Sequence, residues 1–181
     1  MPQTTPTPSR LWKQMTPAER LAAARALWMS EDAADDQVQA AMLIARQRKF
    51  RLKTVVGLGV DRQARHLASL PLIPDAVAGR ILIAYHLANR RPMMSRFLDA
   101  LGVPHDEGVI KEDGPAPDAS KLAPAAAEIG REFPLDEVRL YLNTLVCQDP
   151  ETWGGLTAIV GGLGLADREA APQPAESRVE G

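Results

Sequence analysis

The residues of this chain best suited to chemistry form one short polar group, Tyr85, His86, Arg90 and Arg91, at the end of an apolar segment. Arg90 follows His86 by about one helical turn, so a helix would bring the two side chains to one side. A phenol, an imidazole and two guanidinium groups can together bind an anion. A lone histidine on such a helix is usually a partly buried, hydrogen-bonded residue with a structural role, and we favour that interpretation. The alternative is an anion or small-ligand pocket made by these four residues.

No catalytic residue is assigned to this chain. No carboxylate or nucleophile stands at helical spacing from His86 to make it an evident general base. Paired catalytic carboxylates and a Ser/His/Asp motif are also missing from the sequence. The sequence favours a protein without enzymatic activity, and an enzyme that uses the pocket near Tyr85, His86, Arg90 and Arg91 stays an open alternative.

The strongest charge feature is the basic run 46–53. At about 100° per residue, Arg46, Lys49 and Lys53 share one helix face, while Arg48 and Arg51 lie across from them. Binding to phosphates needs several cations on one accessible surface, because affinity comes from displaced counterions. The divided charge favours a solvated helix end, and a nucleic-acid patch made by Arg46, Lys49 and Lys53 is the alternative.

The sequence gives little support for a metal site or a cofactor site. The single cysteine, Cys147, excludes an intramolecular disulfide and a cysteine metal cluster. His105, Asp106 and Glu107 are adjacent, so their side chains point in different directions. The glycines of 154–167 follow no predicted strand and precede no lysine, unlike a phosphate-binding loop. We predict no metal and no cofactor.

Composition indicates a globular protein, with 45% apolar residues in 181 and a net charge of −2. Arginine outnumbers lysine by 16 to 5, a bias typical of GC-rich bacterial genomes. The N-terminal segment has no basic region followed by an apolar one, and the longest apolar run is interrupted by charges. We therefore expect a soluble, cytoplasmic bacterial protein with no membrane segment.

The periodicity of apolar residues predicts an all-α fold, an irregular or orthogonal bundle of about seven helices. Residues 75–90 are apolar on most of the helix circumference, so we expect them to form the central helix. Thr16, Pro17 and Glu19 form a capping-box pattern at the start of helix 17–29. The other predicted helices are 36–56, 62–70, 93–101, 119–132, 135–148 and 151–160.

We predict one helical domain over 10–166, between disordered tails at 1–9 and 167–181. Its N-terminal helices occupy 10–60. Segments 61–102 and 119–164 share an order of short helix, proline, helix, proline and short helix, which suggests two similar three-helix units joined by a surface loop at 103–118. In such a repeat the polar end 86–91 has a counterpart at 143–149, and a site is expected where these two stretches meet.

A seam of coiled-coil type runs along the predicted helix 36–56, at Val38, Met42, Ala45, Leu52 and Val56, with Lys49 interrupting it. One interpretation is that this seam packs inside the domain. The other is that it binds a protein partner or a second copy of the chain. We adopt a non-enzymatic protein-interaction or self-associating module, with a homodimer as one form, as the leading hypothesis. A nucleic-acid accessory protein and a small-ligand sensor are the alternatives.

Overall fold

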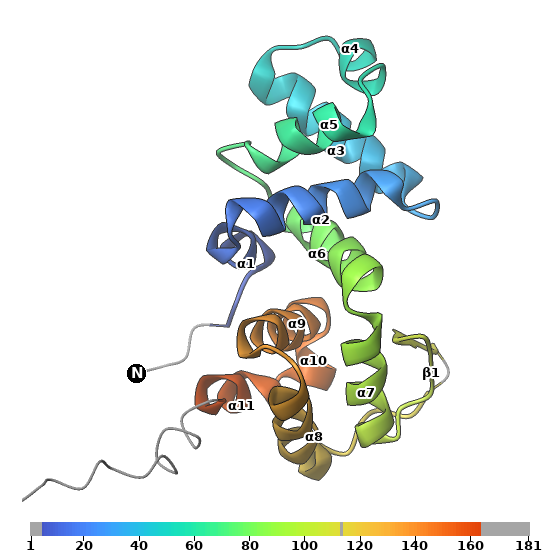
Figure 1. Cartoon of the computed structure of the whole chain (residues 1–181), viewed down its shortest axis with the longest axis vertical. Helices are drawn as coiled ribbons and strands as arrows, with labels where there is room; N and C mark the ends of the chain where they lie inside the picture. The colour runs from blue at the N-terminus through green and yellow to red at the C-terminus, as the bar shows by residue number, and fades with distance from the viewer. Residues whose placement is uncertain (1–4, 113, 164–181) are drawn as a thin grey trace, which may run out of the picture.

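The computed structural model describes residues 5–112 and 114–163 and confirms the all-α class (Figure 1). Within these residues there are eleven helices, not about seven, and one short hairpin. The elements are α1 (Pro8–Gln14), α2 (Pro17–Met29), α3 (Ala34–Arg48), α4 (Leu52–Val56), α5 (Val60–Ala68), α6 (Asp75–Asn89), α7 (Arg91–Leu101), β1 (His105–Asp106), β2 (Val109–Ile110), α8 (Ala119–Glu132), α9 (Leu135–Gln148), α10 (Pro150–Trp153) and α11 (Leu156–Gly162).

Two of the additional helices arise because a predicted helix is divided, and one is a new helix at the N-terminal end of the described chain. Lys49 adopts a left-handed conformation that ends α3, so the predicted helix 36–56 is two helices. Gly154 and Gly155 separate α10 from α11 within the predicted helix 151–160. Pro8 and Ser9, assigned to the N-terminal tail, form the first turn of α1. Residues 1–4 and the predicted C-terminal tail, 167–181, lie outside the described residues.

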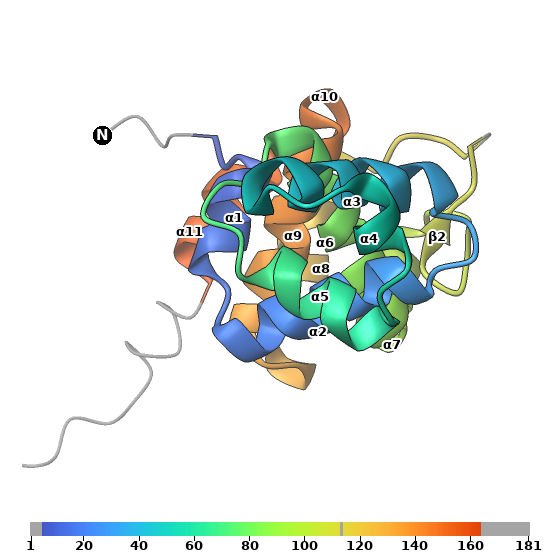
Figure 2. The ribbon, with the colours of Figure 1, turned by 90° about the horizontal axis from the view of Figure 1, so that it is seen from above.

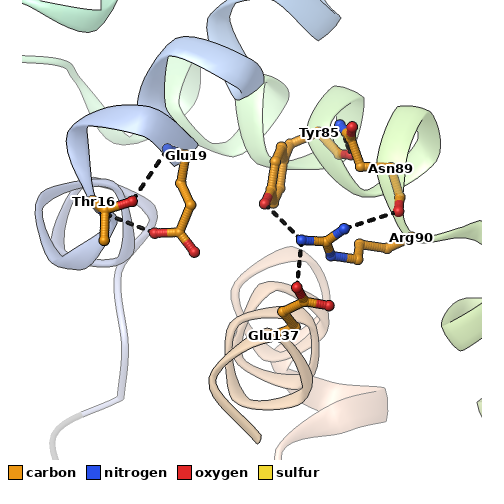
Figure 3. Close-up of polar contacts among 6 residues, drawn as sticks. All are labelled: Thr16, Glu19, Tyr85, Asn89, Arg90 and Glu137. Carbon is orange, nitrogen blue, oxygen red and sulfur yellow. Dashed lines mark hydrogen bonds and ion pairs between the residues drawn. The ribbon is translucent and has the colours of Figure 1, made fainter. Parts of the chain in front are cut away.

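The start of α2 confirms the predicted capping box. The Thr16 hydroxyl accepts a hydrogen bond from the Glu19 amide at 3.2 Å, and a Glu19 carboxylate oxygen accepts one from the Thr16 amide at 2.7 Å (Figure 3). Pro17 occupies the first helical position, where a missing amide hydrogen has no cost. Two backbone donors at this helix end are therefore satisfied within four residues.

We expect Thr16→Ala to lower the free energy of unfolding by about 1 kcal/mol, because it leaves the Glu19 amide without its side-chain acceptor. Urea denaturation followed by circular dichroism measures this change. Thr54→Ala, at an exposed threonine within α4, is the control and should change stability by less than about 0.5 kcal/mol. Equal losses in the two variants would contradict a capping role.

Helix α6 is central, as its sequence predicts. It buries Ala78, Ile81, Leu82 and Tyr85, and it packs against α1, α2 and α9. In Figure 1 it runs between the group of α3, α4 and α5 at one end of the molecule and α8 at the other; Figure 2 looks down on the α3, α4 and α5 end. The segment is apolar on most of its surface because neighbouring helices cover it on several sides.

Two hydrophobic clusters succeed each other along the chain. The first is formed by buried residues between Leu11 and Tyr85, and the second by buried residues between Met93 and Val160. The predicted unit 61–102 is divided between them, because α5 and α6 contribute to the first cluster and α7 to the second. Each cluster therefore contains helices from both sides of a predicted unit boundary. The single domain and the duplication stay predictions.

The predicted loop 103–118 contains a two-stranded antiparallel hairpin, in which His105 pairs with Ile110 and Asp106 with Val109. Glu107 and Gly108 form its turn with φ values of 46° and 88°. A Cβ atom on Gly108 would lie 2.7 Å from the Met94 Cβ atom, so the turn lies against α7 at a distance that only glycine allows. Short strands with mixed charge give no clear alternation of apolar residues, which is why the sequence did not indicate them.

Candidate functional site

Helix α3 separates into an inner and an outer face. Ala40, Ala41 and Ile44 are buried on the inner face, where two alanines allow close approach to the neighbouring helices α5 and α6. Val38 and Met42 lie on the opposite face, and each is 50% exposed. On a helix these two residues are neighbours one turn apart. Two large apolar side chains are therefore held side by side in solvent by the packing of the other face.

Side-chain hydrogen bonds fix the orientation of α3. The Gln37 amide donates to the carbonyl oxygens of Leu27 at 3.0 Å and Ser30 at 2.8 Å, and so satisfies acceptors at the C-terminal end of α2. At the other end of α3, Arg48 donates to the carbonyl and hydroxyl oxygens of Ser69 at 3.0 and 2.7 Å. These contacts anchor both ends of the inner side and leave the outer face directed away from the core.

The predicted seam is thus exposed over most of its length. Leu52 and Val56, on α4, are 42% and 61% exposed, and Ala45 is half-buried. The exposure of the four large residues of the seam, Val38, Met42, Leu52 and Val56, contradicts the interpretation that the seam packs inside the domain. The seam is also discontinuous, because the chain turns at Lys49 and no single helix carries all five side chains. The part that remains on one straight helix is Val38, Met42 and Ala45.

The outer face of α3 carries opposite charges at its two ends. Asp35 lies in the first turn, and Arg46 and Lys49 lie at the last turn and the C-cap, which is the arrangement that the helix dipole favours. Asp35, Arg46, Lys49 and the nearby Lys53 are all exposed. Within the described parts of the chain, none of these four forms an ion pair. The face therefore has an apolar centre between an acidic and a basic end.

The other predicted site does not form as one pocket. The Arg90 guanidinium donates to the Tyr85 hydroxyl at 3.1 Å and to a Glu137 carboxylate oxygen at 2.7 Å, as Figure 3 shows. Glu137 belongs to α9, and both members of the ion pair are about three-quarters buried. This carboxylate already compensates the Arg90 charge, so the cluster has little affinity left for an added anion. Burial raises the pKa of the Tyr85 phenol, which stays protonated.

His86 and Arg91 lie in separate surroundings. Arg91 donates to the carbonyl oxygens of Leu87 at 2.9 Å and Glu107 at 3.2 Å, and so contacts the hairpin. His86 is buried and lies 3.1 Å from the Thr144 hydroxyl of α9. Adjacent helical residues differ by about 100° in direction, and this rotation separates the four side chains that the sequence placed together.

Several partners of these residues were missed by sequence reasoning. Three residues of α9, Glu137, Tyr141 and Thr144, stand 47 to 58 residues after the residues that they contact, Arg90 and His86. The one sequence signal was the predicted meeting of 86–91 with 143–149, and His86 and Thr144 do meet there. Asp35 was also missed as a site residue, although its spacing of seven residues from Met42 can be read from the sequence.

The lone cysteine and the hairpin histidine make local contacts. The Cys147 thiol donates to the Pro6 carbonyl oxygen at 3.2 Å, and burial, with a smaller contribution from the Asp75 charge, raises the pKa of this thiol to about 11. His105 lies 3.1 Å from both Asp99 and the Gly108 amide. The described residues contain no group of three acidic, histidine or cysteine side chains arranged to hold a metal ion.

The fold is all-α, and α3 presents an exposed face with an apolar centre and charged ends. No helix in the described ranges combines the length and the apolar character needed to cross a membrane. Comparisons with protein-family models, curated proteins and solved structures find no significant match. Functional argument therefore depends on the geometry and charge of this chain alone.

Proposed function

We propose that this protein is a non-enzymatic helical interaction module that self-associates through the outer face of α3. The observation that supports it is the pair Val38 and Met42, which are half exposed on a helix that hydrogen bonds hold at both ends of its inner side. The pair lies between oppositely charged ends of the helix. Isolated exposed apolar residues are ordinary on protein surfaces. Here they are aligned at helical spacing, as in helices that pack against a partner helix.

The order of charges on α3 favours a second copy of the chain as the partner. Asp35 stands seven residues before Met42 and Lys49 seven residues after it, about 10 Å to either side. A two-fold axis through Met42 would pair the helices antiparallel and bring Asp35 against Lys49 of the partner subunit, twice in the interface. Such a surface is self-complementary, as a two-fold dimer requires.

Exchanging the charges of Asp35 and Lys49 tests the antiparallel pairing of the two α3 helices. We expect the wild-type chain to dimerise at tens of micromolar, with Lys49→Glu and Asp35→Lys each weakening the dimer about tenfold, because each variant places like charges in contact at two positions. The double variant Asp35→Lys/Lys49→Glu should restore the affinity. Sedimentation equilibrium over a range of concentrations measures all four proteins. Lys121→Glu, at an exposed lysine of α8, is the matched charge control.

The apolar centre is tested by Met42→Asp, which should abolish the dimer. The same substitution at Met29, an exposed methionine of α2, should leave it intact. A wild-type chain that stays monomeric at these concentrations, or a double variant no better than the single ones, would refute the proposal.

A nucleic-acid-associated role is the second candidate, because Arg46, Lys49 and Lys53 stay exposed without an ion pair among the described residues. It has weaker support, because Arg48 is engaged by Ser69 and acidic residues occupy the other end of α3. A gel-shift titration at low and high salt tests this role. Binding that weakens with salt and with Lys49→Glu would favour it, and no binding at low salt would exclude it.

A further inference from the structure

Two open pockets lie along the junction of α2 and α5, which pack against each other and lie side by side in Figures 1 and 2. The first pocket, of about 580 Å³, is lined by the second half of α2 and by residues 57–62. The second, of about 520 Å³, is lined by the start of α2 and by residues 68–71. Arg65 lines both pockets, so they meet at this residue and form one groove, which we call the α2–α5 groove.

Four arginines line this groove, two from each helix. Arg20 and Arg25 belong to α2, and Arg62 and Arg65 belong to α5. Arg62 and Arg65 are both exposed, and their spacing of three residues makes them neighbours on one helix face. Arg20 is half-buried and contributes its terminal nitrogens, since its Nε atom is enclosed. Within the described residues, Arg20, Arg62 and Arg65 form no ion pair.

Asp61 is the single acidic side chain among the described residues that line the groove. Its carboxylate accepts a hydrogen bond from Arg25 Nε at 2.8 Å, so these two charges compensate each other. The groove therefore has three guanidinium groups whose charge nothing in its lining compensates, although the whole chain has a net charge of −2. This local excess of positive charge favours an anionic ligand.

The shape of the groove favours an extended ligand. Between Pro17 and Met29, which lie at its two ends, α2 rises about 18 Å, or about five nucleotides of one strand at roughly 3.4 Å each. Packed helices have axes about 8–10 Å apart, so a groove between them admits one strand and is too narrow for a duplex. Apolar side chains of Leu21, Met29 and Val60 lie between the arginines in the lining.

We propose that the α2–α5 groove binds a single strand of nucleic acid through its phosphates. Arginine suits this role, because its planar guanidinium group can donate two parallel hydrogen bonds to one phosphate. The bases would lie over Leu21, Met29 and Val60, whose side chains have no hydrogen-bonding group, so binding should not depend on base sequence. The proposal is independent of the dimer through α3, and it uses a different surface from the basic run 46–53.

Fluorescence anisotropy with a labelled strand of eight thymidine nucleotides tests the proposal. The wild-type chain should bind this strand at 50 mM salt, and three phosphate contacts predict a slope of about −2 for log affinity against log salt. The affinity should therefore fall about twentyfold between 50 and 200 mM salt. A duplex of the same length should bind about tenfold more weakly, because it does not enter the groove.

The double variant Arg62→Gln/Arg65→Gln removes two phosphate contacts and breaks no ion pair of the described chain, so the fold and the α3 dimer should be kept. Its affinity at 50 mM salt should fall more than about tenfold, and its salt slope should fall to about −0.7. Arg46→Gln/Lys49→Gln on α3 makes the same change in net charge and should bind the strand like wild type. Sedimentation equilibrium should show that Arg62→Gln/Arg65→Gln self-associates like wild type, which separates this test from that of the dimer.

A gain of affinity is expected for Asp61→Asn, because it removes the acidic side chain from the groove and releases Arg25. This variant should bind the strand several-fold more tightly. Asp36→Asn is the matched control, since it releases Arg80 of α6, which does not line the groove.

Four results would overturn the proposal. They are no binding of the strand at 50 mM salt, a duplex that binds as tightly as the single strand, an equal loss of binding in the α3 control, and an Asp61→Asn variant no tighter than Asp36→Asn. Equal competition by poly-glutamate would also overturn it, because the groove would then be a site for an acidic peptide.

Discussion

Acidification from pH 7 to pH 5 is expected to lower the free energy of unfolding by about 2 kcal/mol through His86. The pKa of this buried imidazole is lowered from 6.5 to about 3, first by burial and second by the Arg90 charge. The His86 ring contacts the side chains of Thr144, Tyr85 and Tyr141, and none of these is a carboxylate that could compensate a positive charge. A proton on Nδ1 would also lack an acceptor within the described chain.

The sign follows from proton binding in the two states. Well above pH 6.5 the histidine is neutral in both the folded and the unfolded chain and contributes no slope. Between pH 6.5 and pH 3 the unfolded chain binds a proton that the folded chain excludes, so acid favours unfolding by up to about 1.4 kcal/mol per pH unit. The stability is therefore present at neutral pH and is lost progressively toward pH 3.

Urea denaturation at pH 7, 6 and 5 measures this effect, and His86→Gln is the decisive variant. Three carboxyl groups with lowered pKa values do not interfere with this measurement, namely those of Asp75, Asp118 and Asp149. Their ordinary pKa is 3.8, so their protonation changes the stability mainly below the range of pH 5 to 7. The slope should disappear in His86→Gln, whatever that substitution costs at neutral pH. A wild-type slope that persists unchanged in His86→Gln would show that other groups cause it.

Removal of the Phe97 ring is expected to cost about 3 to 5 kcal/mol, a large part of the total stability of an ordinary domain. Phe97 is fully buried on α7. Its ring meets Tyr141 of α9 edge-on at 5.8 Å and Trp153 of α10 at 6.2 Å, so one side chain joins three helices of the second cluster. Phe97→Ala would leave a void that the surrounding helices can fill only in part.

Urea denaturation of Phe97→Ala tests this cost. Phe50→Ala is the matched control, since Phe50 is 39% exposed and should lose less than about 1 kcal/mol. The same curves test the prediction of one domain over 10–166. A single cooperative transition, shifted as a whole by Phe97→Ala, would agree with one domain, whereas a separate early transition would show that the second cluster unfolds independently.

The helices that the sequence predicted well depend on local interactions. The capping box of Thr16 and Glu19 involves residues three apart, and the apolar wrap of 75–90 is a property of one segment. Prolines and glycines also marked most helix ends correctly. Predictions failed where a residue took an uncommon conformation: Lys49 is left-handed, a role that glycine usually fills, and it divided the predicted helix 36–56.

The candidate sites were predicted less well, because each depends on contacts across the fold. The sequence indicated a seam at Val38 and Met42, but only the structure shows that the buried Ala40, Ala41 and Ile44 leave that seam in solvent. Val38 and Ile44 are equally apolar, so composition does not say which face of α3 the neighbouring helices cover. Burial is a property of the assembled helices.

The sequence by itself determined the helical class, the central position of 75–90 and the capping box at the start of α2, because each follows from spacing within one segment. Only the tertiary structure decided the pairing of Arg90 with Glu137 and of His86 with Thr144. Those pairs bring together α6 and α9, and their directions depend on how the two helices pack. Helix packing is thus the physical reason that the four residues form an internal ion pair, a hairpin contact and a buried histidine instead of one pocket.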